Sequence, residues 1–302
     1  MKLLKGIVLL GLVLVFAQCK TDEEVDPKGG GGFSNANYAA LSYNGQTRYY
    51  TLYVPESYDA SQGASLVINY HGFGGEAFAH LEEVGVQFGL HYVAEAGQFI
   101  VVYPQGVERD KGAPEWDPGD NGLEDITSND VFFTQQLIAT LASNYSIDTD
   151  RVYAIGYSNG GMMAYGLACN LADQIAAVGI MSGVMLEDDC NTDFTTSVIH
   201  FHGINDDVLP YTGNSDYQSI DSIVDFWLDH NQIPSSSLNQ SNLENGAVLL
   251  EEWTGGSEGT AYTLYTINEE NGSPGGHVWF SAAIDGRSPN QILWDFLSAF
   301  SL

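Results

Sequence analysis

The sequence predicts an α/β fold with a mostly parallel central sheet and helices on both faces. Apolar runs of strand length alternate with segments of helical periodicity through most of the chain. Several of these runs are nearly continuous, which is typical of strands buried on both faces, and they end in glycine-rich loops. The 302 residues, 44% of them hydrophobic, are compatible with one large domain or two small ones. No internal repeat and no second linker interrupts the pattern, so we expect one domain over residues 37–302.

The first 18 residues have the pattern of a secretory signal peptide. Lys2 and Lys5 provide a basic start, and an apolar run over residues 7–17 follows. These 11 residues are too few to span a bilayer as a mature helix. We therefore expect residues 1–18 to be removed and the protein to be secreted.

Cys19 stands directly after this segment, where bacterial lipoprotein signals are cleaved and the cysteine is acylated. The residues before it, 16–18, depart from the usual lipoprotein box, so an ordinary cleaved signal that leaves one odd thiol is the alternative. Residues 19–36 contain a charged run and four consecutive glycines, which indicates a lipidated flexible tether. The protein would then be held at the outer membrane or cell surface, with the lipid as its only membrane contact.

The regular elements follow from the periodicity of the remaining chain, in order. In the first half we expect strands over residues 47–54, 65–70, 99–103 and 152–155, and helices over residues 130–145 and from 162 onwards. In the second half we expect strands over residues 176–181, 197–201, 247–253 and 261–267, and helices over residues 217–229 and 290–300. This alternation of strands and helices is what predicts the parallel sheet.

A polar loop over residues 105–129 carries a group of acidic side chains. They are Asp117, Asp120, Glu124 and Asp125. Their spacing does not match a calcium-binding EF-hand loop, so we interpret the segment as a solvated loop and expect no metal site there.

The charge balance excludes whole classes of partner. The chain has 9 Lys and Arg against 39 Asp and Glu, a formal net charge of −30. Nucleic acids and anionic lipid surfaces both require basic patches, so we expect no nucleic-acid partner. The simplest interpretation of the acidic surface is solubility.

The motif on which the functional interpretation depends is G-x-S-x-G over residues 156–160. It lies where the apolar run 152–155 gives way to a helical pattern. At such a junction, glycines permit a strained turn that exposes the serine, an arrangement called a nucleophile elbow. Ser158 is therefore the candidate nucleophile.

A serine hydroxyl needs an imidazole to accept its proton and a carboxylate to orient that imidazole. Asp206 follows the expected strand 197–201, and His277 lies in a later glycine-rich loop. The chain order Ser158, Asp206, His277 is that of α/β-hydrolases. Asp207 is the nearest rival for the acid. The other histidines are interpreted as core or surface residues (His80, His91, His200 and His230) or as turn or pocket supports (His71 and His202).

Acyl transfer also needs hydrogen-bond donors for the developing oxyanion. The glycine-rich segment 71–75 is of the type that supplies them, although by itself it is equally consistent with a plain tight turn. We expect the backbone N–H groups of Phe73 and Asn159 to be the donors. No step of this chemistry calls for a cofactor, and we expect none.

Four segments together resemble the polyhydroxybutyrate depolymerase and feruloyl esterase family of secreted α/β-hydrolases. They are residues 71–75, 156–163, 202–211 and 275–279, and the resemblance covers roughly residues 37–300. It implies an α/β-hydrolase fold without a large lid, and Ser158, Asp206 and His277 as the catalytic triad. Asp207 departs from the family pattern, which often has proline there.

Cys169 and Cys190 fall where members of that family often carry a disulfide. If Cys19 carries lipid, these are the two cysteines that remain to pair in an oxidising compartment. Aromatic residues beside the motifs are candidates for the substrate pocket, with plain packing as the alternative. They are Trp116, Tyr157 and Trp279, with His71 as a further pocket residue.

The family includes polyester depolymerases, feruloyl esterases and acetylxylan esterases. Depolymerases that attack solid polyester commonly carry a separate polymer-binding domain, whereas this sequence ends soon after His277. We therefore expect a serine carboxylic-ester hydrolase that acts through an acyl-enzyme on short or aromatic esters. The alternatives are a polyhydroxybutyrate (polyester) depolymerase and, in another class, a non-catalytic lipoprotein that binds glycan or polyester; a peptidase is a weaker possibility.

Overall fold

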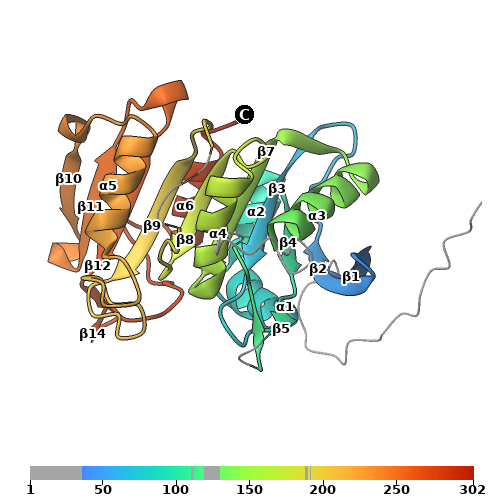
Figure 1. Cartoon of the computed structure of the whole chain (residues 1–302), viewed down its shortest axis with the longest axis horizontal. Helices are drawn as coiled ribbons and strands as arrows, with labels where there is room; N and C mark the ends of the chain where they lie inside the picture. The colour runs from blue at the N-terminus through green and yellow to red at the C-terminus, as the bar shows by residue number, and fades with distance from the viewer. Residues whose placement is uncertain (1–35, 110–111, 119–129, 188–189, 191) are drawn as a thin grey trace, which may run out of the picture. The chain divides into compact units, whose positions relative to one another are not determined.

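A ten-stranded sheet forms the centre of the computed structural model, which describes residues 36–109, 112–118, 130–187, 190 and 192–302. The strand order is β1-β2-β4-β3-β7-β8-β9-β12-β11-β10. Strands β4, β3, β7, β8, β9 and β12 are parallel to their neighbours within this group, and the outer strands pair antiparallel. The predicted α/β class with a mostly parallel sheet is confirmed (Figure 1).

The strands of this sheet are β1 (Ala36–Tyr43), β2 (Gln46–Tyr53), β3 (Ala64–Tyr70), β4 (Ile100–Pro104), β7 (Ile147–Tyr157), β8 (Ala177–Met181), β9 (Ser197–Gly203), β10 (Asn239–Leu243), β11 (Val248–Trp253) and β12 (Tyr262–Ile267). Two small hairpins pair β5 (Val107–Glu108) with β6 (Pro114–Glu115) and β13 (Glu269–Glu270) with β14 (Ser273–Pro274). All predicted strands are present. The edge strands β1 and β10 were not predicted, and β1 begins at the last residue assigned to the tether.

The helices are α1 (Ala77–His80), α2 (Leu90–Gly97), α3 (Asp130–Asn144), α4 (Asn159–Asn170), α5 (Ile220–His230) and α6 (Pro289–Leu297). A π-helical segment, η1 (Leu81–Gln87), joins α1 to α2, and short 3₁₀ turns occur at η2 (Ser235–Ser237), η3 (Glu244–Gly246) and η4 (Ser257–Gly259). The predicted helices are present, with ends that differ by up to three residues.

Each face of the sheet is covered by its own group of helices. Helices α3, α4 and α5 pack on one face, and α1, η1, α2 and α6 pack on the other (Figure 1). Because successive side chains of a strand point to opposite faces, Leu66 and Ile68 of β3 join the first core while Val67 joins the second. The long apolar runs in the sequence reflect this burial on both sides.

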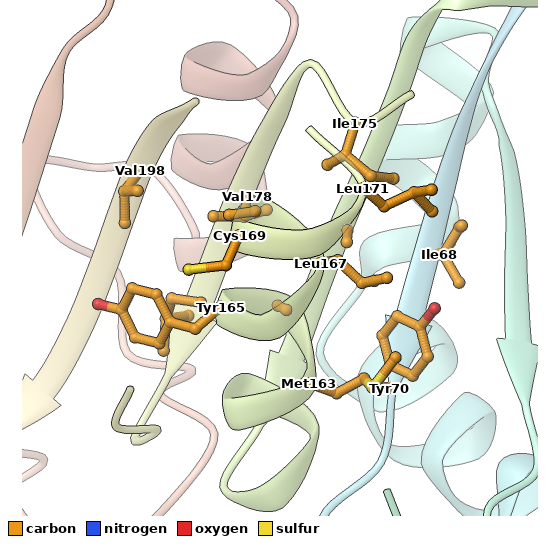
Figure 2. Close-up of a cluster of buried hydrophobic side chains, with 14 of the residues drawn as sticks. Ile68, Tyr70, Met163, Tyr165, Leu167, Cys169, Leu171, Ile175, Val178 and Val198 are labelled. Atoms are coloured by element: carbon orange, nitrogen blue, oxygen red, sulfur yellow. The ribbon is translucent and has the colours of Figure 1, made fainter. Parts of the chain in front are cut away.

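The core beneath α4 is shown in Figure 2, where Met163 and Leu167 of this helix, and Leu171 directly after it, point toward the central strands. Cys169, near the end of α4, forms a disulfide with Cys190, and their Cα atoms are 4.7 Å apart. The pairing predicted from the sequence is confirmed.

Some predictions concern residues outside the described part of the chain. The signal peptide, residues 19–35 of the tether with Cys19, and the acidic side chains of Asp120, Glu124 and Asp125 all lie there. Within the residues that the structure does describe, no helix has both the length and the apolar character that a bilayer-spanning segment needs.

We expect replacement of Cys169 and Cys190 by alanine to lower the free energy of unfolding by about 3 kcal/mol, because the bond closes a loop with a sequence separation of 21 residues. Urea unfolding followed by circular dichroism measures the change, and reduced wild type should match the double variant. If the oxidised wild type and the double variant unfold at the same urea concentration, the prediction is wrong.

Candidate active site

Ser158 occupies a strained turn between β7 and α4. Its φ and ψ are 54° and −118°, a backbone conformation that residues other than glycine rarely adopt. Its N–H donates to the Met181 carbonyl of β8 at 2.9 Å. A Cβ at Gly160 would clash with the carbonyls of Tyr70 and His71, so only glycine lets α4 begin this close to the end of β3. The chain therefore has the geometry of a nucleophile elbow.

Three side chains from different strand ends meet at this turn. The Ser158 hydroxyl donates to His277 Nε2 at 2.8 Å, and His277 Nδ1–H donates to Asp206 Oδ2 at 2.7 Å. His277 lies beyond β14, and Asp206 lies in the turn after β9. The structure thus brings together Ser158, Asp206 and His277 in one hydrogen-bonded chain, in which the imidazole can accept the serine proton.

Asp206 is buried, whereas its neighbour Asp207 is exposed. Asp206 Oδ1 accepts the N–H groups of Leu209 at 2.8 Å and Val208 at 3.0 Å. Burial alone would raise the pKa of the Asp206 carboxyl, but the hydrogen bonds from His277 and Leu209 hold that pKa below its ordinary value. The carboxylate is therefore ionised at neutral pH and able to orient His277.

Two hydrogen bonds fix the backbone that carries His277. The Tyr157 hydroxyl donates to the His277 carbonyl at 2.9 Å, and the Ser182 hydroxyl donates to the Val278 carbonyl at 2.9 Å. The Tyr157 ring also lies 5.2 Å from the imidazole, centroid to centroid. Burial, and then the Asp206 and Glu83 carboxylates, raise the pKa of Tyr157 to about 12, so its hydroxyl remains a donor.

His71 lies beneath the glycine-rich loop. It is buried, its Nδ1–H donates to the Gly72 carbonyl at 2.7 Å, and its Nε2 accepts the Gly106 N–H at 3.0 Å. Burial lowers the pKa of His71, which favours the neutral form that these bonds require. Sequence reasoning placed His71 in the substrate pocket, and the structure places it where it supports two loops. Phe73, in the same glycine-rich loop, is half exposed.

Trp116 joins the glycine-rich loop to the start of α4. Its ring N–H donates to the His71 carbonyl at 2.8 Å, and its backbone N–H donates to Asn159 Oδ1 at 2.7 Å. The ring is buried edge-on against Tyr70, at 5.0 Å between centroids. Trp116, expected in the pocket, is thus a brace between the two segments that carry the candidate oxyanion donors, Phe73 and Asn159.

A buried ion-pair cluster binds the backbone next to Trp116. Asp130, at the start of α3, binds Arg48 at 2.8 Å and Arg109 at 2.9 Å. The same carboxylate accepts the Asp117 N–H at 2.8 Å. Sequence reasoning missed this cluster, because Arg48 and Asp130 are 82 positions apart and nothing in either local pattern points to the other.

A pocket of about 270 Å³ opens beside the His277 loop. Tyr157 and Trp279, two of the expected pocket residues, line it together with His80, Glu83, Phe88, Glu270, Val278 and Ser281. The Trp279 ring N–H donates to Asn290 Oδ1 at 3.2 Å, which orients the ring. Over the described residues, no group of three or more His, Cys, Asp or Glu side chains is arranged to hold a metal ion.

The family of this chain follows from its similarity to known proteins. Residues 42–234 match the family described as "Putative esterase". The chain belongs to this esterase family. It is 24% identical to feruloyl esterase C of Emericella nidulans, over 97% of this chain and 98% of that protein. It is 30% identical to a bifunctional acetylxylan esterase/xylanase of Neocallimastix patriciarum, over 70% of this chain and 28% of that protein.

Among solved structures, the acetyl xylan esterase from Aspergillus awamori has a TM-score of 0.61 at 15% identity, over 87% of this chain and 99% of that chain. A thermostable esterase has a TM-score of 0.58 at 17% identity, over 89% of this chain and 64% of that chain. These likenesses show the α/β-hydrolase fold that the sequence resemblance implied. With its family and fold, the protein is a carboxylic ester hydrolase.

The buried histidines of this esterase predict how its stability depends on pH. Burial lowers the pKa of His80 to about 3 and that of His91 to about 4, against about 6.5 in an unfolded chain. Below pH 6.5 the unfolded chain therefore binds protons that the native state does not. The free energy of unfolding should fall as pH drops from 6.5 toward 4, by about 1.4 kcal/mol per pH unit for each histidine.

Chemical unfolding at a series of pH values measures this slope. His80→Gln keeps a side-chain N–H for Asn69 Oδ1, which His80 Nε2 contacts at 2.9 Å, but it cannot titrate. The slope of this variant should be smaller than that of wild type by about 1.4 kcal/mol per pH unit. Equal slopes for the two proteins would contradict the prediction.

Proposed function

We propose that the protein is a serine ester hydrolase in which Ser158 is the nucleophile, His277 the general base and Asp206 the orienting acid. The observation that supports it is the hydrogen-bonded chain from Asp206 through His277 to Ser158, at 2.7 and 2.8 Å. Its substrates are short or aromatic carboxylic esters.

In the first half-reaction, Ser158 Oγ bonds to the ester carbonyl carbon while His277 Nε2 takes the hydroxyl proton. The bond from that carbon to the alcohol oxygen then breaks, and the alcohol leaves with the proton from Nε2. In the second half-reaction, a water molecule attacks the acyl-enzyme and gives a proton to the same nitrogen. The carboxylic acid departs, and the proton returns to Ser158. Asp206 orients the imidazole and stabilises its cation at both stages.

The oxyanion of each tetrahedral intermediate is bound by the backbone N–H groups of Phe73 and Asn159 in this proposal. Asn159 is the first residue of α4, and the first N–H groups of a helix have no acceptor within that helix. The bonds of Trp116 to the His71 carbonyl and to Asn159 hold the two segments in register. Loss of one such donor in other enzymes costs about 3 to 4 kcal/mol of transition-state stabilisation.

The size of the pocket beside Tyr157 and Trp279 supports the proposal that the substrates have short or aromatic acyl groups. Its volume of about 270 Å³ exceeds the roughly 150 Å³ that holds a benzene ring in an engineered cavity. The names of the relatives, feruloyl esterase and acetylxylan esterase, are consistent with this substrate class.

A specific observation also favours the second candidate, hydrolysis of a polyester such as polyhydroxybutyrate. Apolar side chains next to the functional residues are exposed: Phe73 is 49%, Val208 55% and Val278 41% accessible. An apolar polymer chain would contact such side chains, whereas a soluble ester would leave them in water. Release of soluble acid from a suspended polyester film tests this candidate.

The purified protein should hydrolyse p-nitrophenyl acetate and methyl ferulate, and Ser158→Ala should lower kcat by a factor of about 10⁴ or more. The ratio of the two activities reports the acyl preference. Asp206→Asn should lower kcat by a factor of up to about 10⁴, because the imidazole loses its orienting acceptor.

Asp207→Asn is the matched control, since it changes the adjacent, exposed carboxylate and should leave kcat within about twofold. If Ser158→Ala keeps the wild-type kcat with either ester, the proposal is wrong. If wild type hydrolyses neither ester nor the polyester, the non-catalytic binding lipoprotein becomes the better account.

We also propose that residues 1–18 direct secretion, that Cys19 carries lipid at the membrane or cell surface, and that residues 37–302 form the single catalytic domain. The basic start, apolar run and following cysteine in the sequence support this. A radiolabelled fatty acid should label wild type but not Cys19→Ala, while Ser34→Ala in the same tether should keep the label. Equal label in wild type and Cys19→Ala would refute the lipid anchor.

A further inference from the structure

Two histidines that the proposed mechanism does not use lie directly behind the triad acid. His200 and His202 are near the end of β9, three and one positions before Gly203, and Asp206 follows in the next turn. Because they are two residues apart on a strand, their side chains share one face of the sheet. Both are fully buried.

His202 contacts the turn that holds Asp206. Its Nε2 is 2.8 Å from the Leu209 carbonyl and 3.5 Å from Asp206 Oδ2. The N–H groups of Val208 and Leu209 in turn donate to Asp206 Oδ1. The imidazole of His202 therefore fixes the backbone that binds one carboxylate oxygen, and its N–H edge faces the other oxygen, the one that accepts from His277.

The hydrogen bonds allow one arrangement of protons. The Leu209 carbonyl can only accept, so His202 Nε2 carries hydrogen and, in a neutral ring, Nδ1 must accept. His200 Nε2, 3.2 Å away, is the donor to it, which leaves His200 Nδ1 to accept from the Tyr165 hydroxyl at 3.0 Å. Tyr165 is linked to the Tyr262 hydroxyl at 3.0 Å, and Tyr262 is 3.3 Å from the same His200 nitrogen.

An additional proton on His202 would lie on Nδ1 and face the N–H of His200 Nε2, 3.2 Å away. Burial lowers the pKa of both rings, and both therefore remain neutral near pH 7. The groups around His202 are Asp206, His277, His200, the backbone of Leu209 and Gly183, and the Tyr211 ring at 6.0 Å. The row of hydrogen bonds thus runs from two core tyrosines through two neutral imidazoles to the Leu209 carbonyl, with Asp206 Oδ2 at 3.5 Å from the last ring.

We propose that His202 is a positioning residue for Asp206, held in its donating orientation by His200 and the Tyr165–Tyr262 pair. The inference rests on the proposed function, since it assigns His202 a role through the triad. When His277 takes the Ser158 proton, the resulting cation is stabilised only if the carboxylate lies in its plane and within hydrogen-bond distance. The donor edge of His202, together with the turn it holds, restricts rotation of that carboxylate.

The experiment compares three replacements of His202 in the full protein. Gln places an amide N–H near the position of Nε2, Asn places one near the position of Nδ1, and Met fills similar space with no donor. His230→Met is the matched control, because His230 Nε2 makes the same kind of bond, 3.0 Å to the Phe194 carbonyl, in α5 away from the triad residues. Rates with p-nitrophenyl acetate are divided by the number of active sites found in a burst titration.

We expect His202→Met to lower kcat per active site by about 10- to 100-fold, the range for a hydrogen bond to a charged group, with KM within about twofold. The low-pH limb of its kcat/KM profile should move to lower pH by about half a unit or more, because the imidazolium is less stabilised. His202→Gln should recover most of kcat, His202→Asn should not, and His230→Met should match wild type.

A merely structural role would change the number of active sites and not the pH profile per site. The inference is overturned if His202→Met keeps wild-type kcat and profile per site, or if Gln is no better than Asn. If the Met variant does not fold, comparison of kcat between His202→Gln and His202→Asn still tests the inference. Ser158→Ala in the same series distinguishes failure of the proposed function from failure of this inference. If Ser158→Ala keeps the wild-type kcat, the proposed function is wrong. If Ser158→Ala is inactive while His202→Met keeps the wild-type kcat and pH profile, only this inference is wrong.

Discussion

The close approach of α4 to the end of β3 is the constraint on which the rest of the site depends. Glycine at position 160 lets the start of the helix lie against the carbonyls of Tyr70 and His71. Ser158 can then occupy its left-handed turn, with the strain offset by its N–H bond to Met181. The same approach places the first N–H groups of α4 next to the glycine-rich loop. One packing contact therefore positions both the proposed nucleophile and the candidate oxyanion donors.

Hydrogen bonds between loops convert this contact into a fixed arrangement. Trp116 ties the glycine-rich loop to Asn159, and Asp130 with its two arginines holds the segment that carries Trp116. On the other side, Tyr157 binds the backbone of the loop that carries His277. Because these partners come from rigid strand and helix ends, the distances among the triad side chains depend on the sheet and not on the loops alone.

The central strands, and the three side chains that the structure joins by hydrogen bonds, could be found in the sequence because each leaves a local signal. Strands buried on both faces are nearly continuous apolar runs, and an elbow serine is flanked by glycines. The edge strand β10 (Asn239–Leu243) escaped prediction because it is polar and mostly exposed, so it resembles a loop. Trp116 was assigned to the pocket because an aromatic residue in a loop near a motif has the same local pattern whether it lines a cavity or braces two segments. Its partners, His71 and Asn159, are more than 40 positions away.

The histidines illustrate how burial divides roles among chemically identical side chains. A general base must reach substrate and water, and the side chain of His277, the proposed base, keeps 12% of its surface accessible. A residue that only orients the acid needs no access, and His200 and His202 have none. Burial also disfavours the doubly protonated forms that would compete with orientation, because it lowers the pKa of both rings. In the role proposed for them, the two rings would therefore orient Asp206 toward His277 without titrating alongside it.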